Sequence, residues 1–281
     1  TFLKYIKTHA GKQCAIVAPT GVAAINAGGE TIHSFLQLPF GPFVPGSAGG
    51  FGRQAEGSND KHSLLANMRL RETKLKLLRK LELLIIDEVS MVRADLLDSM
   101  DLVLRHVRKN WAQPFGGVQL LFIGDLFQLP PVAPEQDWDI LRHYYHSPYF
   151  FDSVVLRDNP PIYIELKKIY RQKEQTFIDI LNRIRSGMVL QQDVEILNAR
   201  YDPLPQKEKG YIILSTHNHI ADKINLQSLE ELPGKLHSFT GTITNEFNPK
   251  NLPTEEVLQL KEGAQIMFVK NDLQTPRRYY N

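Results

Sequence analysis

The sequence predicts an α/β fold with parallel β-sheets, because short apolar runs alternate with segments of helical periodicity. Three such runs in the first half of the chain each end in small or polar residues. They are Cys14–Ala18 before Pro19-Thr20-Gly21, Leu83–Ile86 before Asp87-Glu88, and Val118–Ile123 before Gly124-Asp125. Continuous apolar runs of this length are typical of parallel strands buried on both faces. Ligands bind open α/β sheets at the carboxyl ends of the strands, so we expect a crevice lined by these three clusters.

A helix is expected over Asp95–Lys109, where apolar residues recur on one face at Leu96, Met100, Val103 and Val107. Acidic residues near its start and basic residues near its end follow the preference of the helix macrodipole. For the basic end we expect a solvated helix terminus, formed by Arg105, Arg108 and Lys109.

The length of 281 residues predicts about two domains. We place them at residues 1–160 and 161–281, because a new series of apolar runs follows Pro160-Pro161. In the second domain, strands are expected over Ile162–Leu166 and Tyr211–Leu214, with further strands on either side of Glu262-Gly263. The glycine-rich stretch within residues 40–65 is too long for an ordinary connection and predicts a functional or disordered insert.

Composition narrows the class of protein. The chain is 42% hydrophobic and 23% charged, as in globular domains, and its net charge of +2 means that nucleic acid would need a local groove. Its one cysteine, Cys14, cannot form an internal disulfide or a cysteine-based metal site, which fits a reducing cytosol. No apolar run reaches the roughly 18 residues of a membrane helix, so we expect no membrane partner.

The acidic pair Asp87-Glu88 after Leu83–Ile86 has the form of a Walker B strand. The first acid can hold Mg²⁺ directly or through water, and the second can polarise an attacking water, as phosphoryl transfer requires. The alternative is an acidic pair that caps a helix after a strand. For this motif alone, that alternative is the better interpretation.

The segment Gly124–Pro131 carries more information. An expected strand ends at Asp125, and Gln128 follows three residues later. A glutamine can hydrogen-bond both a γ-phosphate oxygen and a neighbouring water, which suits a nucleotide sensor. A turn that uses aspartate and proline for backbone reasons is the alternative. It explains the prolines, but not an acid and an amide at the mouth of the crevice.

Arg171 follows the expected strand at the start of the second domain. An arginine brought onto phosphate bound in the other domain would stabilise charge in the transition state. For an isolated arginine, a surface salt bridge is the better interpretation.

The small residues Pro19–Ala24 predict a strand-to-helix turn, where backbone amides attract phosphate and Thr20 adds a hydroxyl. A plain tight turn explains Gly21 equally well. His33 is interpreted as a hydrogen-bonded core histidine, because no His or Cys lies at metal-ligand spacing.

Taken in order, five motifs resemble the petite-integration-frequency DNA helicases of superfamily 1, class B, to which RecD-like enzymes are related. The motifs are Ala-Pro-Thr-Gly-Val-Ala-Ala-Ile-Asn, Thr-Ile-His-Ser-Phe, Ile-Ile-Asp-Glu-Val-Ser-Met, Gly-Asp-Leu-Phe-Gln-Leu-Pro-Pro-Val and Tyr-Arg-Gln. The helix at 95–109 with Pro114-Phe115-Gly116-Gly117 resembles the segment that marks this family. The similarity covers essentially the whole chain, and five motifs in order are far more specific than any one.

The resemblance implies two RecA-like lobes with parallel sheets, the second incomplete, with ATP in the cleft between them. It implies that Asp87 is the acid associated with Mg²⁺ and that Glu88 orients water. Gln128 would sense the γ-phosphate beside Gly124 and Asp125, and Arg171 would reach it from the second lobe.

The resemblance also implies that single-stranded DNA runs across both lobes, with translocation in the 5′-to-3′ direction. Thr20, Gly21 and His33 fall in motifs that contact the strand, and Asn218 is assigned a contact in the second lobe. The insert near residues 40–65 corresponds to a small wedge that helps to split duplexes. The implied partners are single-stranded DNA and forked duplex DNA, bound by a monomer.

The family's phosphate-binding loop is expected immediately before Phe2, and its C-terminal motifs are also missing. We therefore expect this chain alone to be unable to hydrolyse ATP. The alternatives are a RecD-type or relaxase-helicase subunit and a non-catalytic DNA-binding module. The second is disfavoured because Asp87, Glu88, Gln128 and Arg171 are all present. We expect a cytoplasmic protein of bacterial or phage origin, or a nuclear or mitochondrial one in a eukaryote.

Overall fold

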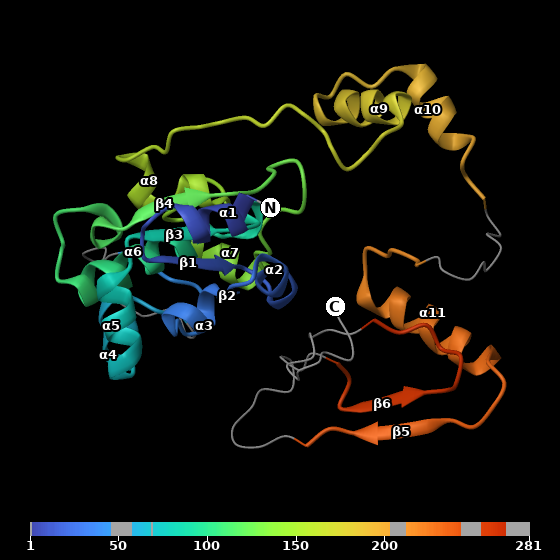
Figure 1. The fold of residues 1–281 in the computed structure, drawn as a ribbon, viewed down its shortest axis with the longest axis horizontal. Coiled ribbons are helices and arrows are strands. Elements are labelled where there is room, and N and C mark those ends of the chain that lie inside the picture. The colour runs from blue at the N-terminus through green and yellow to red at the C-terminus, as the bar shows by residue number, and fades with distance from the viewer. Residues whose placement is uncertain (1, 46–57, 69, 203–211, 243–253, 268–281) are drawn as a thin grey trace. The chain divides into compact units, whose positions relative to one another are not determined.

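The computed structural model describes residues 2–45, 58–68, 70–202, 212–242 and 254–267 (Figure 1). The chain divides into two compact units, Thr1–Arg185 and Ser186–Asn281. This division lies later in the chain than the lobe boundary predicted after residue 160. The two predicted lobes stay a prediction.

A four-stranded parallel sheet forms the centre of the first unit. In the spatial order β2-β1-β3-β4, its strands are β2 (Glu30–Thr31), β1 (Cys14–Ala18), β3 (Leu83–Ile86) and β4 (Gln119–Phe122). The prediction of an α/β fold with a parallel sheet is therefore confirmed. The three apolar runs form β1, β3 and β4 within one residue of their expected bounds.

Helices and 3-10 turns surround this sheet on both faces (Figure 1). They are α1 (Phe2–His9), α2 (Gly21–Ala27), α3 (Ile32–Leu36), α4 (Lys61–Asn67), α5 (Glu72–Lys80), η1 (Val89–Met91), α6 (Ala94–Arg108), η2 (Pro114–Gly117), α7 (Glu135–Leu141), η3 (Phe150–Asp152) and α8 (Val154–Arg157). The first unit ends with α9 (Gln175–Arg185), which does not cover the sheet.

Strand β3 shows why an unbroken apolar run is needed. Leu84 and Ile86 face a large core cluster that includes Leu97 and Met100 of α6. Leu83 and Ile85 face a smaller cluster on the other side of the sheet, against which α1 packs. All four strand residues are buried, so neither face tolerates a polar side chain.

Helix α6 is buried more completely than its apolar stripe predicts. Met100, Val103 and Val107 lie in the core as expected, and Leu97 and Leu104 are also buried. A helix enclosed on several sides needs apolar residues beyond one face.

The prediction of a solvated basic end of α6 is correct for Lys109, which is exposed, and wrong for Arg105 and Arg108. Arg108 donates hydrogen bonds to the carbonyl oxygens of Leu81 and Gly116, both at 2.8 Å, and to that of Leu78 at 3.0 Å. Arg105 pairs with Asp101 at 2.8 Å. The end of α5 and the turn η2 offer carbonyl groups without helical partners, and the Arg108 guanidinium supplies the missing donors.

The insert at 40–65 is described only in part, because residues 46–57 lie outside the described ranges. Its two ends meet, since Phe43 and Asn59 form an isolated parallel bridge. Val44 N donates to Asn59 O at 2.8 Å, and Asn59 N donates to Pro42 O at 2.8 Å. The assignment of this insert as a wedge stays a prediction.

The second unit contains α10 (Gln191–Asn198), α11 (Asn218–Glu231) and an antiparallel pair of strands, β5 (His237–Thr240) and β6 (Val257–Leu260). Residues 264–267, after the Glu262-Gly263 turn, form no strand, and the rest of that expected strand lies outside the described residues.

Two other expected strands are not found among the described residues. Ile162–Leu166 has no regular secondary structure there, and neither has 212–214, the described part of Tyr211–Leu214. The side chains of Ile162 and Leu214 are 93% and 87% exposed. Apolar character predicts burial, but a strand also requires a neighbour with which to form hydrogen bonds.

Across the described residues, no helix has the length and apolar character that crossing a membrane requires.

Candidate nucleotide and nucleic-acid site

The acidic pair lies at the carboxyl end of β3, as predicted. Asp87 N donates to Val17 O of β1 at 2.9 Å, which fixes the end of the strand. Glu88 N then donates to Asp87 Oδ1 at 3.1 Å. Glu88 adopts a left-handed conformation with φ 52°, which costs a non-glycine residue free energy. Both side chains are half-buried, so they remain accessible at the edge of the sheet.

The segment after β4 joins the acidic pair through main-chain contacts. Ile123 N donates to Ile86 O at 2.9 Å, and Val89 N donates back to Ile123 O at 2.9 Å. A Cβ on Gly124 would stand 2.9 Å from Val89 N. The second and third expected clusters therefore lie side by side, and a glycine is required where they touch.

Asp125 organises the turn that carries Gln128. Its carboxylate accepts from Phe127 N at 3.1 Å and from Gln128 Nε2 at 3.2 Å. Gln128 N donates to the Asp125 carbonyl at 3.0 Å, and the Gln128 side chain is exposed. Asp125 therefore stabilises the backbone of the turn, as the alternative interpretation of this segment predicted. The same carboxylate also orients the side-chain amide of Gln128.

The donor set at this edge fits magnesium better than a metal held by protein alone. Mg²⁺ is usually bound by one or two carboxylates, with waters and substrate phosphates completing its shell. Asp87 offers such a carboxylate at the strand end. Among the described residues, no group of three or more His, Cys, Asp or Glu side chains could hold a metal ion.

Thr20 and Gly21 lie where β1 passes into α2. Thr20 is the N-cap of α2, and its Oγ1 accepts from Ala23 N at 3.2 Å. Gly21 is exposed, and a Cβ on it would meet no atom within 4 Å. Neither crowding nor a positive φ requires glycine here, so a tight turn alone does not explain it.

His33 differs from the predicted core histidine. Its ring is half-buried and stacks on Phe40, with centroids 5.1 Å apart. Within the part of the chain that the structure describes, the ring nitrogens make no hydrogen bond. Burial lowers the pKa of His33 below 6.5, the nearby Arg93 lowers it further, and Asp95 opposes the shift. The imidazole is therefore neutral at pH 7.

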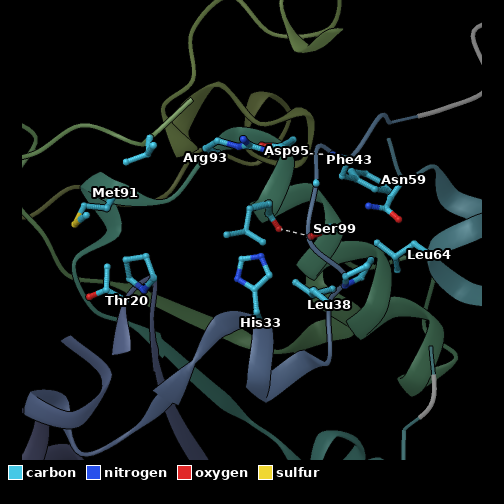
Figure 2. A pocket seen from close by; sticks show the side chains of 15 residues that line it. Thr20, His33, Leu38, Phe43, Asn59, Leu64, Met91, Arg93, Asp95 and Ser99 are labelled. Carbon is cyan, nitrogen blue, oxygen red and sulfur yellow. Dashed lines mark hydrogen bonds and ion pairs between the residues drawn. The ribbon is translucent and has the colours of Figure 1, made fainter. Parts of the chain in front are cut away.

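Thr20 and His33 line one pocket of about 260 Å³ in the first unit (Figure 2). The His33 ring points into it from α3, and Arg93 and Asp95 lie across the cavity at the start of α6. Met91 of η1, three residues after Glu88, forms part of the wall. The pocket thus lies next to the acidic pair along the chain.

A partly buried ion-pair network lines one side of this pocket. Arg93 donates to Asp95 at 2.7 and 2.8 Å and to Asp137 of α7 at 2.6 Å. Asp95 is 1% exposed and also accepts from Phe43 N at 2.9 Å. Sequence reasoning missed this network, because Asp95 also suits the first turn of any helix. Only the fold brings Asp137 and Phe43 to it.

Two further predicted site residues, Arg171 and Asn218, are exposed. Arg171 lies in a segment without regular secondary structure. Asn218 is the exposed first residue of α11 and belongs to the second unit. Their roles stay predictions.

Comparisons with known proteins identify the family of the chain. Residues 51–195 match the family model described as PIF1-like helicase. The ATP-dependent DNA helicase PIF1 of Saccharomyces cerevisiae is 34% identical over 279 residues, covering 96% of this chain and 30% of that protein. This chain thus spans about a third of that relative's length.

Two solved structures are similar over the whole chain. A Bacteroides Pif1 helicase in complex with ADP-AlF3 and single-stranded DNA has a TM-score of 0.77 and 39% identity, covering 100% of this chain and 61% of that one. A structure of DNA unwinding at forked double-stranded DNA by two coordinating Pif1 helicases has a TM-score of 0.77 and 38% identity, with 100% and 62% coverage. With the ordered motifs and the parallel sheet, these matches establish that the chain belongs to the PIF1-like helicase family.

Proposed function

We propose that this sequence forms part of the motor of an ATP-dependent DNA helicase that translocates 5′ to 3′ on single-stranded DNA and unwinds duplexes. The observation that carries the proposal is the main-chain junction between the segment of Asp87 and Glu88 and the segment of Gly124–Gln128. It places two acids and an oriented amide at one sheet edge, as phosphoryl transfer requires. The names and ligands of the similar proteins support the same reaction.

In this proposal ATP binds at the sheet edge with Mg²⁺ held by Asp87. Glu88 orients the attacking water, and Gln128 contacts the γ-phosphate from the turn that contains Gly124 and Asp125. Arg171 stabilises charge on the transferred phosphate, because an arginine carries its charge at every working pH.

Single-stranded or forked DNA is the proposed track, contacted by Thr20, Gly21 and His33 and by Asn218 of the second unit. We further propose that the motor works as a monomer in DNA replication, repair, recombination or telomere maintenance. A cytoplasmic location in a bacterial or phage system is proposed, and the similarity to the Bacteroides structure supports it. The alternative is a nuclear or mitochondrial location in a eukaryote, which the similarity to the Saccharomyces cerevisiae helicase supports.

Replacement of Glu88 by Gln in the full-length protein tests the catalytic assignment. We expect DNA-stimulated ATP hydrolysis and unwinding of a substrate with a 5′ overhang to be lost, while single-strand binding is retained. Glu72→Gln is the matched control, because Glu72 is exposed and, among the described residues, pairs with Lys76 alone at the surface.

Three results would contradict parts of the proposal. Normal turnover by Glu88→Gln would show that another group orients the water. Unwinding only from a 3′ overhang would exclude the polarity. Strand binding by the wild-type protein without any ATP hydrolysis would identify a non-catalytic DNA-binding module.

A further inference from the structure

The pocket lined by Thr20 and His33 has the size of a site for one ring system. Its volume of about 260 Å³ falls just below the range of roughly 300–1,000 Å³ that holds drug-sized ligands. A whole nucleotide would exceed this space, whereas a nucleobase would not. Leu38, Leu64 and Met91 give it apolar walls, which suit the faces of a planar ring.

The charges around the pocket favour a neutral occupant over a phosphate. Arg93 is the cation that lines it, and its guanidinium is already held by Asp95 and Asp137 at 2.6–2.8 Å. A phosphate would have to compete with two carboxylates for this group and would lie near both of them. Phosphate sites instead present cations or amides that are available to the anion.

His33 supplies polar recognition of the kind that a base edge needs. Its ring points into the cavity (Figure 2) and, across the residues that the structure describes, has no hydrogen-bond partner. A neutral imidazole has one donor and one acceptor nitrogen, so it can pair with the mixed donor and acceptor edge of a nucleobase. Stacking on Phe40 fixes the plane of the ring.

We propose that this pocket receives a single unstacked nucleobase of the strand on which the motor moves. The inference rests on the proposed function, because it assumes that the strand contacts Thr20, which lines the pocket. Removing a base from its neighbours is least costly in single-stranded DNA. The ring then gains apolar contact with Leu38 and Met91 and hydrogen bonding to His33.

The test uses the full-length protein and oligo-dT strands that each carry 2-aminopurine at one position. We expect the fluorescence of the bound probe to change several-fold more at one position of the footprint than at its neighbours. Leu96→Phe, at a half-buried wall residue, fills the cavity and should abolish this difference. It should also weaken strand binding about 5-fold or more, the low end of the effect of losing one base contact.

Two further variants make the test decisive. Leu77→Phe is the matched control, because Leu77 is 43% exposed and lies outside this pocket, and it should keep the position-specific signal. Ser99→Met fills the same cavity from α6 and should also abolish the position-specific signal. It takes the place of Leu96→Phe in the test if Leu96→Phe does not fold. Thermal melting identifies any variant that is not folded.

Equal fluorescence at every position of a bound strand would overturn this inference and leave the proposed function standing. The same conclusion follows if a folded Leu96→Phe protein keeps the position-specific signal, because the probe would then lie elsewhere. Failure of the wild-type protein to bind any strand would overturn the proposed function and this inference together.

Discussion

Gly124 lies directly against the backbone of Val89, so that a Cβ on Gly124 would stand 2.9 Å from Val89 N and 3.0 Å from Val89 Cγ1. Val89 follows Glu88, and Gly124 begins the turn that carries Gln128. The spacing between the proposed water-orienting acid and the proposed sensor is therefore set by main-chain contact.

Gly124→Ala should disturb this spacing. Because the nearest obstacle is a backbone atom, one of the two segments must move, and overpacking of this kind costs about 1–3 kcal/mol. We expect DNA-stimulated ATP hydrolysis by the full-length protein to fall sharply, with a matching loss of stability in urea. Gly241→Ala is the control, since the one described atom within 4 Å of its Cβ would be Glu256 O, at an ordinary 3.5 Å. Unchanged hydrolysis by Gly124→Ala would show that the junction tolerates movement.

Arg171→Ala should abolish ATP hydrolysis with little effect on folding. The Arg171 side chain is exposed, so its removal leaves no buried group without a partner. We expect near-normal single-strand binding and thermal stability beside the lost turnover. Arg142→Ala, which removes an exposed arginine paired with Asp139, should keep full activity. Wild-type turnover without Arg171 would favour the surface role of an ordinary arginine.

Tyr145→Phe should destabilise the first unit. Tyr145 is buried, and its hydroxyl donates to Asp98 at 2.8 Å. The same carboxylate accepts from Val154 N and Val155 N. A hydrogen bond to a charged group contributes about 1.5–3 kcal/mol, and we expect a loss of this size in urea unfolding. Tyr144→Phe removes a hydroxyl from the neighbouring, half-buried tyrosine and should cost less. Equal stability of the two variants would contradict the role of this bond.

Stability should depend on pH through His33. Burial, with a smaller contribution from Arg93, lowers the pKa of its imidazole below 6.5 in the folded protein. Between that lowered pKa and 6.5, the unfolded chain binds the proton more readily. The contribution of His33 is therefore complete above pH 6.5 and is lost as the pH falls through the folded-state pKa. The opposing effect of Asp95 is smaller.

Thermal melts between about pH 7.5 and about pH 5 measure this contribution, since histidine titrates in that window. We expect the melting temperature of the wild-type protein to fall more steeply toward low pH than that of His33→Phe, which keeps an aromatic ring against Phe40. His106→Phe, at an exposed position on α6, should retain the wild-type slope. Parallel slopes for the wild type and His33→Phe would exclude the titration of His33 as the cause.

Much of the sheet could be predicted because its strands are apolar on both faces. Each of β1, β3 and β4 carries that signal within its own residues. Strand β2 does not, since Glu30 and Thr31 are polar and pair only at one edge, opposite Val17 and Ala18. The strand predicted over Ile162–Leu166 is wrong for a different reason. This segment is apolar, but it has no neighbouring strand among those described.

The candidate site was predictable where it depends on strand ends. Asp87 and Gly124 come together because parallel neighbours end at the same sheet edge. The Arg93 network was not predictable, since Asp137 lies 44 residues away in sequence and nothing local links the two. The contacts of Arg108 were not predictable either, because the carbonyl groups to which it donates come close to it only after folding.

The bridge between Phe43 and Asn59 has a practical consequence for protein engineering. It closes the chain into a loop whose ends are fixed by backbone hydrogen bonds and by Asp95. The entropy of closing such a loop grows slowly, by about 0.6 kcal/mol for each doubling of its length. A reporter peptide or fluorophore tag grafted between these two residues should therefore be accommodated without unfolding the sheet.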